Sequence, residues 1–210
     1  MVNITYAITV CNELEEITNL INFLKPRIES DDEILIQYDS DSATQAVTDY
    51  LRILSQLHNT NIKVIGFPLN NDFASYKNNL KNHAQGMFIF QIDADEIPSE
   101  YLVNNMRDLL DSNKDVDLFF VPRVNTVKGL TEAHIQKWGW KVNDNGWVNW
   151  PDYQTRLYRR TSEIEWQGKV HERIVGYNTL TILPQQEEYS LYHAKEIERQ
   201  EKQNAYYDTI

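Results

Sequence analysis

The sequence has little cysteine, little positive charge and no long apolar run, and each shortage excludes a class of protein. Cys11 is the only cysteine in 210 residues, so no internal disulfide can form and a reducing compartment is expected. Lys and Arg number 20 against 31 Asp and Glu, and the resulting net charge of −11 disfavours binding to nucleic acid or to an anionic membrane. No apolar run approaches the length of a membrane span, and the N-terminus is unlike a signal peptide. We therefore expect a cytoplasmic protein with no integral membrane segment and no nucleic-acid partner.

The glycine-rich loops that commonly cradle phosphate groups are also missing. Neither a G-x-G-x-x-G motif nor a Walker A motif occurs in the chain. A phosphorylated ligand would therefore have to be held by a metal ion and by side chains. Hydrophobic residues make up 41% of the sequence, an ordinary content for a soluble domain with a substantial core.

Strand-like and helix-like segments alternate through the first half of the chain. Apolar stretches predict strands at residues 4–10, 34–36, 63–67 and 87–92. Apolar residues at helical spacing predict helices at 14–24, 47–57, the second half of 70–84, and 102–110. Asn12 is expected to be the N-cap of the first helix, and Pro26 to end it. This alternation favours a mostly parallel, Rossmann-like sheet with right-handed crossovers.

The pattern changes after a strand-like segment at 117–121. Residues 124–153 resemble a loop and hold four of the five tryptophans, namely Trp138, Trp140, Trp147 and Trp150. Strand-like pieces follow at 155–160, 164–175 and 179–183, and the charged tail from Ala194 predicts a helix. We expect a single α/β domain over residues 1–210. Its first half, about 1–122, would bind a nucleotide, and its aromatic-rich half, about 123–210, would bind another ligand.

The stretch 87–100, MFIFQIDADEIPSE, combines a buried strand with an acidic end. Five of its first six residues are apolar, as in a strand buried on both faces. Side chains alternate along a strand, so Asp93 and Asp95 should point the same way. Two neighbouring carboxylates repel unless a cation lies between them, and oxygen ligands suit Mg²⁺ or Mn²⁺. The alternative is a solvated acidic turn before the next helix, and the motif alone does not decide between the two.

Polar residues follow three strands of the first half at the point where each strand ends. The three segments are Val10-Cys11-Asn12-Glu13, Asp39-Ser40-Asp41-Ser42 and Asp93-Ala94-Asp95. Open α/β sheets bind ligands at the carboxyl ends of their strands, so these segments should meet at one crevice. Lys77 is the nearest candidate cation before the strand that carries Asp93.

In their order and spacing, these motifs resemble the family-2 glycosyltransferases of GT-A fold, in particular those of lipopolysaccharide-core type. The resemblance extends over roughly residues 4–208 and includes Asp93-Ala94-Asp95 as the Asp-x-Asp motif. Lys77-Asn78 stands where the family has a basic residue followed by Asn. Two further matches lie in the second half, Arg156-Leu157-Tyr158-Arg159 and Trp166-Gln167-Gly168-Lys169-Val170-His171-Glu172.

The resemblance implies a GT-A domain that moves a sugar from a nucleotide-diphosphate donor, most often a UDP-sugar, to a saccharide or another hydroxyl acceptor. Asp39 would accept a hydrogen bond from the base, beside the backbone of Val10, Cys11 and Asn12. Asp95 would ligate Mn²⁺ or Mg²⁺, Asp93 would approach the ribose or the ion, and His193 would be a third ligand. The ion would stabilise charge growing on the leaving diphosphate. The other nucleotide-sugar-binding candidates are Glu13, Lys77, Ala94, Arg156 and Trp166.

Members of such a family are expected to invert the anomeric carbon, so a general base must reach the acceptor hydroxyl. We predict Glu172 in this role, with Asp152 as the second candidate. Trp166 and the tryptophans at 138–150 could stack on sugar faces. Each role has a structural alternative. Asp39 could cap a turn, His193 could be a hydrogen-bonded core residue, Lys77 could be an exposed lysine, Glu172 could pair with Arg173 or Lys169, and the tryptophans could be plain packing.

Two positions depart from the family pattern. Asp41 replaces a glycine and adds negative charge near the nucleotide, and Cys11 stands where a hydroxyl or aromatic residue is commoner. Two other functions remain open. One is a non-catalytic sugar- or nucleotide-binding module on a GT-A scaffold. The other is a haloacid-dehalogenase-like phosphatase, which needs its Asp-x-Asp motif near the N-terminus and Thr or Val where this chain has Ile97.

Overall fold

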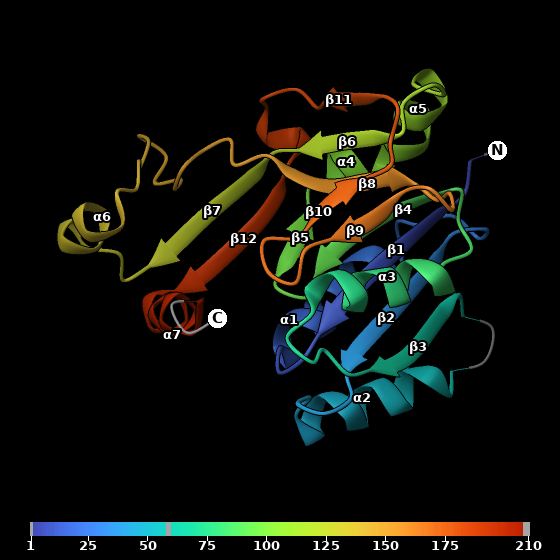
Figure 1. The fold of residues 1–210 in the computed structure, drawn as a ribbon, viewed down its shortest axis with the longest axis horizontal. Helices are drawn as coiled ribbons and strands as arrows, with labels where there is room; N and C mark the ends of the chain where they lie inside the picture. The colour runs from blue at the N-terminus through green and yellow to red at the C-terminus, as the bar shows by residue number, and fades with distance from the viewer. Residues whose placement is uncertain (1, 58–59, 208–210) are drawn as a thin grey trace.

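A mixed seven-stranded sheet forms the centre of the protein (Figure 1). The structure is a computed structural model and describes residues 2–57 and 60–207, so the ends of the predicted domain, 1 and 208–210, lie outside it. The strands, in spatial order, are β11 (Leu180–Ile182), β6 (Leu118–Val121), β8 (Gln154–Arg159), β4 (Phe88–Asp93), β1 (Ile4–Val10), β2 (Glu33–Asp39) and β3 (Ile62–Phe67). Parallel pairing joins β4, β1, β2 and β3, whereas β8 runs antiparallel between β4 and β6. The α/β fold with a mostly parallel sheet, predicted from the sequence, is confirmed.

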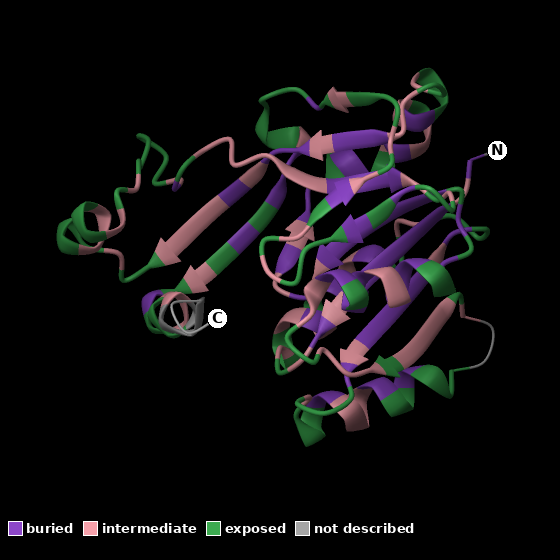
Figure 2. Ribbon diagram, viewed as in Figure 1, coloured by how far each residue is buried: buried purple, intermediate pink, exposed green. Residues whose placement is uncertain are grey.

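Both faces of this sheet are covered, which explains why its strands read as continuous apolar runs. Because side chains alternate along β1, Tyr6 and Ile8 join one core cluster and Ala7 joins the other. The first face packs against α1 (Leu14–Leu24), α2 (Gln45–Ser55), α4 (Glu100–Asn104) and α5 (Met106–Ser112). The second face packs against α3 (Phe73–His83) and a two-stranded sheet of β9 (Glu165–Gln167) and β10 (Arg173–Val175). Figure 2 shows the central strands as mainly buried and the outer helix faces as exposed.

A smaller sheet, with two of its three strands from the second half, extends from the body as an arm (Figure 1). It consists of β5 (Glu96–Pro98), β12 (Leu191–Glu196) and β7 (Arg123–Lys128), with β12 antiparallel to β5 and parallel to β7. Helix α6 (Glu132–Trp138) follows β7, the short 3-10 helix η1 (Glu187–Tyr189) precedes β12, and α7 (Ile197–Tyr207) follows it. Within the described ranges, no helix has both the length and the apolar character needed to cross a membrane.

Several boundaries differ from the sequence prediction. The segment 124–153 is not a plain loop, because most of β7 and all of α6 lie in it. The predicted strand 164–175 is split into β9 and β10 by a turn in which Gly168 has a φ of 98°. The helix predicted from Ala194 begins only at Ile197, because pairing with β7 keeps the chain extended to Glu196.

Two predicted helices also need correction at particular residues. Asn12 is not the N-cap of α1: Glu13 occupies that position without a side-chain cap, and its carboxylate folds back onto the preceding backbone. The predicted helix 102–110 is two helices that meet at Asn105. Leu57, predicted on the apolar face of α2, lies beyond its end and is exposed.

Candidate active site

The carboxyl ends of β1, β2 and β4 meet at a cavity of about 1040 Å³. Parallel register places Val10 beside Tyr38 and Thr9 beside Asp93, so the three strands end together, as predicted. Residues of β7, 140–156 and β12 also line the cavity. Every site residue predicted from the sequence lies on its wall: Val10, Cys11, Asn12, Glu13, Asp39, Lys77, Asp93, Ala94, Asp95, Asp152, Arg156, Trp166, Glu172 and His193.

The first two strand ends are held by carboxylates that bind backbone groups. Glu13 Oε2 accepts hydrogen bonds from the N–H groups of Cys11 at 2.8 Å and Asn12 at 2.9 Å. Asp39 is buried, and its Oδ1 accepts from the N–H groups of Asp41 and Leu69, both at 3.2 Å. Asp39 therefore does stabilise its own turn, as the structural alternative held, while it also lines the cavity.

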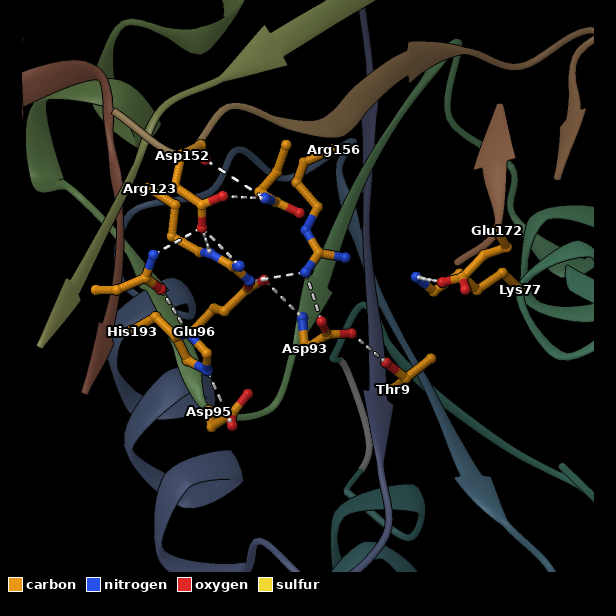
Figure 3. Close-up of polar contacts among 12 residues, drawn as sticks. Thr9, Lys77, Asp93, Asp95, Glu96, Arg123, Asp152, Arg156, Glu172 and His193 are labelled. Carbon is orange, nitrogen blue, oxygen red and sulfur yellow. Dashed lines mark hydrogen bonds and ion pairs between the residues drawn. The ribbon is translucent and has the colours of Figure 1, made fainter. Parts of the chain in front are cut away.

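Asp93, the last residue of β4, is bound on both sides. Its Oδ1 accepts from the Thr9 hydroxyl at 2.9 Å, and its Oδ2 accepts from Arg156 Nη2 at 2.5 Å (Figure 3). Burial alone would raise the pKa of Asp93, but the charges of Arg156 and Lys77 outweigh burial and hold that pKa well below its usual range. Asp93 therefore presents a permanent negative charge at the centre of the site.

Asp95 has a different set of partners, because the strand ends before it. Ala94 and Asp95 form a turn, so the alternation expected along a strand does not extend from Asp93 to Asp95. Asp95 Oδ2 lies 3.3 Å from His193 Nε2 and 3.3 Å from Arg199 Nη2. Burial raises the pKa of Asp95, but the His193 hydrogen bond and the Arg199 charge lower it further than burial raises it.

The orientation of His193 follows from a chain of hydrogen bonds. Asn125 Nδ2 donates to Asp152 Oδ2 at 2.6 Å, so the amide oxygen of Asn125 faces His193 and accepts from its Nδ1–H at 2.8 Å. Nε2 is then the ring nitrogen that faces the Asp95 carboxylate. The register of the arm sheet produces this arrangement, since His193 on β12 lies opposite both Glu96 on β5 and Asn125 on β7.

This pair of side chains suits a divalent cation. Metal-bound histidines usually donate their other ring N–H to an oxygen acceptor, which here is Asn125. Across residues 2–57 and 60–207 no group of three or more His, Cys, Asp or Glu side chains is placed to hold a metal ion. An ion at Asp95 and His193 would therefore take its remaining ligands from substrate phosphates and water, as Mg²⁺ and Mn²⁺ commonly do. The donor set fits such an ion.

A buried network of alternating charges supports these residues, and the sequence analysis missed its central members (Figure 3). Glu96 is fully buried and accepts from Arg123 Nη1 at 2.8 Å, from Arg156 Nη2 at 2.7 Å and from the Asp93 N–H at 3.1 Å. Glu96 is visible in the sequence as a third carboxylate, directly after Asp95. Its partner Arg123 carried no signal, because only the folded arm brings β7 to this position.

Asp152, the second candidate base, is the other end of this network. Its Oδ2 accepts two hydrogen bonds from Arg123, at 2.9 and 2.7 Å, and its Oδ1 accepts from Gln154 Nε2 at 2.9 Å. Burial raises the pKa of Asp152, but the Arg123 charge and the hydrogen bonds it receives lower that pKa overall. A φ of 35° at a non-glycine residue is strained, and these contacts hold it in place.

Glu172 lies on the opposite side of Asp93 from Asp152 (Figure 3). Its Oε1 accepts from Lys77 Nζ at 2.5 Å, and that ammonium also lies 4.4 Å from the centroid of the Trp166 ring. Lys77 is buried, so the alternative of an exposed surface lysine is wrong. Trp166 is only 3% exposed and donates its indole N–H to Tyr158, so its ring supports Lys77 and does not offer an open stacking face.

The C-terminal segment adds cations that the sequence analysis did not single out. Arg199 on α7 donates to Glu13 at 2.8 Å and Glu16 at 3.1 Å and also approaches Asp95. Lys195 and Lys202 line the same cavity. A strongly acidic chain therefore places several cations near the carboxylates of the site, where they can offset the charge of an anionic substrate.

Comparison with known proteins agrees with this architecture. A model of the family described as Glycosyl transferase family 2 matches residues 5–180. No curated protein sequence matches the chain. The crystal structure of S. aureus TarS is similar with a TM-score of 0.61 and 14% identity, covering 92% of this chain and 37% of that one. The structure of TarS 1–349 in complex with UDP-GlcNAc gives a TM-score of 0.58 and 15% identity over 93% of this chain and 59% of that one. The chain spans about 60% of the length of TarS 1–349, and at these identities the similarity is one of fold.

Proposed function

The chain belongs to glycosyl transferase family 2, and on that premise we propose that it is a metal-dependent, inverting transferase that moves a sugar from a UDP-sugar to a saccharide or other hydroxyl acceptor. The observation that carries this proposal is the convergence of Asp39, Asp93 and Asp95 on one large cavity at the carboxyl ends of parallel strands. The complex of TarS 1–349 with UDP-GlcNAc supports a uridine nucleotide as the donor class.

On the donor side, the nucleoside would lie over the ends of β1 and β2. The N–H groups of Asp41 and Leu69 both donate to Oδ1 of Asp39. Oδ2 is therefore the oxygen that would accept an N–H from the base. The backbone of Val10, Cys11 and Asn12 would lie beside the ring, and Asp93 beside the ribose. Arg156 and Lys77 keep Asp93 ionised there.

Asp95 and His193 would hold the divalent ion, Mn²⁺ or Mg²⁺. When bound, the ion would neutralise charge that grows on the departing diphosphate. The residues of the chain contribute orientation: Asn125 fixes the His193 ring, and Arg199 contributes positive charge beside Asp95.

For the acceptor, Glu172 would remove the hydroxyl proton as the new glycosidic bond forms. The Lys77 contact fixes the position of the Glu172 carboxylate. Asp152 is the less suitable base, because four hydrogen bonds from Arg123, Asn125 and Gln154 already occupy its oxygens. Asp152 would instead hold Arg123, Asn125 and Gln154 in place beside the acceptor.

The proposal is tested by nucleotide release from a panel of nucleotide sugars with Mn²⁺, comparing the wild type with Asp95→Ala and Glu172→Gln. We expect metal-dependent release of one nucleotide, its loss in Asp95→Ala, and a fall of at least about 100-fold in transfer by Glu172→Gln with donor binding retained. Asp152→Asn is the matched comparison for the base. Nucleotide binding by calorimetry without any turnover would instead support a non-catalytic binding module. The absence of both nucleotide binding and turnover would refute the transferase proposal.

A further inference from the structure

The cavity has two chemically different walls. The wall formed by β1, β2, β4 and the residues around Lys77 is ionic, and the proposed function assigns it to the donor. The opposite wall comes from the segment that connects β7 of the arm to β8, together with the first residue of β8, and includes Trp140, Val148, Asn149 and Gln154. The total volume of about 1040 Å³ lies at the upper end of the usual range for ligand pockets, so a second ligand can occupy the arm side.

The five tryptophans differ in what their rings contact. His134 stacks on Trp138 with ring centroids 5.2 Å apart and planes at 14°, which covers one of its faces. Trp147 and Trp150 pack edge to face at 4.9 Å, and neither lines the cavity. Trp166 is buried under Lys77. Trp140 contacts the Trp138 ring, with centroids 4.6 Å apart and planes at 47°, and among the described residues it is the tryptophan that the segment after β7 contributes to the cavity wall.

The backbone holds Trp140 in a defined place. Gly139 ends α6 in the left-handed conformation with a φ of 64°, and the Trp140 N–H then donates to the Ile135 carbonyl at 3.1 Å. The next residue, Lys141, is joined to Asn149 by two hydrogen bonds, of 2.7 Å from the Asn149 N–H and 2.9 Å to the Asn149 side chain. Trp140 thus begins a paired loop that returns to the site, where the Val148 N–H donates to Asn125 of β7 at 2.9 Å.

The polar groups on the same wall are suited to hydroxyl groups. Asn149 and Gln154 carry amides, which can both donate and accept. The carboxylate of Asp152 is paired with Arg123, so this part of the wall has little uncompensated charge. A flat aromatic ring beside amides is the combination that binds a pyranose, because the C–H face of the sugar packs on the ring while its hydroxyls bind polar groups.

We propose that Trp140 forms the floor of the acceptor subsite and that the acceptor is a pyranoside whose apolar face stacks on this indole ring. This inference rests on the proposed transferase function and adds the chemical class of the acceptor. Asn149 and Gln154 bind its hydroxyls, and the ring orients the attacking hydroxyl toward the donor wall.

The experiment compares Trp140→Ala and Trp140→Phe with Trp147→Ala, a matched control in the same loop that does not line the cavity. Donor hydrolysis without acceptor and transfer to a panel of methyl pyranosides are measured for each variant. We expect Trp140→Ala to raise the acceptor KM about tenfold, which corresponds to roughly 1.4 kcal/mol. Donor hydrolysis should fall much less than transfer in Trp140→Ala, and Trp147→Ala should keep the wild-type acceptor KM. Trp140→Phe should restore part of the affinity.

A direct binding measurement keeps this inference separate from the transferase proposal. Binding of the same pyranosides is measured by isothermal titration calorimetry in wild type, Trp140→Ala and Trp147→Ala, with no donor present. Binding lost in Trp140→Ala but retained in Trp147→Ala supports the subsite even if no nucleotide sugar is turned over. An unchanged acceptor KM in Trp140→Ala overturns it, as does the absence of pyranoside binding to the wild type or an equal loss of binding in both variants.

Discussion

Glu96 is the residue whose replacement should most clearly show how the site is held together. Its side chain is fully buried and accepts from Arg123, Arg156 and the Asp93 N–H. Glu96→Gln keeps the size of the side chain and replaces one acceptor oxygen with an NH₂ donor. Whichever way the amide is turned, that NH₂ faces another donor, either a guanidinium group or the Asp93 N–H.

The magnitude follows from the kind of bond that is lost. A hydrogen bond to a charged group contributes about 1.5–3 kcal/mol, and removing one partner of a buried ion pair costs about 3–5 kcal/mol. Asp93 and Asp152 remain to pair with the two arginines, so the lower part of this range applies. We expect the free energy of unfolding to fall by about 3 kcal/mol and Tm by about 6–12 °C, at roughly 2–4 °C per kcal/mol for a chain of this size.

The matched control is Glu196→Gln. Glu196 pairs with Lys128 at 3.0 Å, but the side chains are 58% and 83% exposed, so this pair should contribute less than about 1 kcal/mol. Scanning calorimetry and urea titration of both variants measure the difference. Equal shifts in Tm for Glu96→Gln and Glu196→Gln would refute the conclusion that the buried network stabilises the site.

Two further predictions concern acid stability and backbone conformation. The pKa of Asp152 is lower in the folded than in the unfolded chain, so its ionised form stabilises the fold above about pH 4, and this stabilisation is lost as the pH falls toward the folded-state value. At neutral pH, Asp152→Asn should unfold with a free energy about 1–2 kcal/mol below that of the wild type. In urea titrations this difference should shrink as the pH is lowered from about 5 to about 3, and a difference that stays constant would contradict the role of the ionised carboxylate. Gly176→Ala should cost more than about 2 kcal/mol, because a Cβ there would lie 1.8 Å from the Glu163 carbonyl oxygen at a φ of 80°. Gly146→Ala, at a φ of 77° with nothing within 4 Å, should cost only about 1 kcal/mol in the same denaturation assay, and equal losses would argue against the steric cause.

The parts of the fold that the sequence predicted well are those that depend on local pattern. Apolar runs gave the four strands of the first half, and parallel pairing then brought Val10, Asp39 and Asp93 to one edge. The chain after Val121 was predicted less well, because its strands are short and are defined by partners far away in the sequence. Arg123 and Asn125 are examples: their roles depend on β12, about 70 residues later in the chain.

The same distinction explains the errors at single residues. The N-cap pattern at Asn12 was local and plausible, but the Glu13 carboxylate binds the turn itself and also receives Arg199 from the last helix. Lys77 is a charged residue on a polar helix, and only Glu172 and Trp166 from the second half make its burial possible. Long-range pairs of this kind leave no periodic signal in the sequence.

The path of the chain through the arm has a consequence for how this protein can diversify. The donor wall is assembled from strand ends at residues 9–13, 39 and 93–95, so a change in one segment must remain compatible with the others. The part of the arm wall that holds Trp140 comes from one stretch, residues 126–149, whose two ends are held together where the Arg123 N–H donates to the Pro151 carbonyl at 2.9 Å. Loop closure there is already complete, so the tip between these ends can be lengthened or exchanged at little entropic cost. If the donor binds at the strand ends and the acceptor at the arm side, exchange of this one segment could give a new acceptor preference while the nucleotide site stays unchanged.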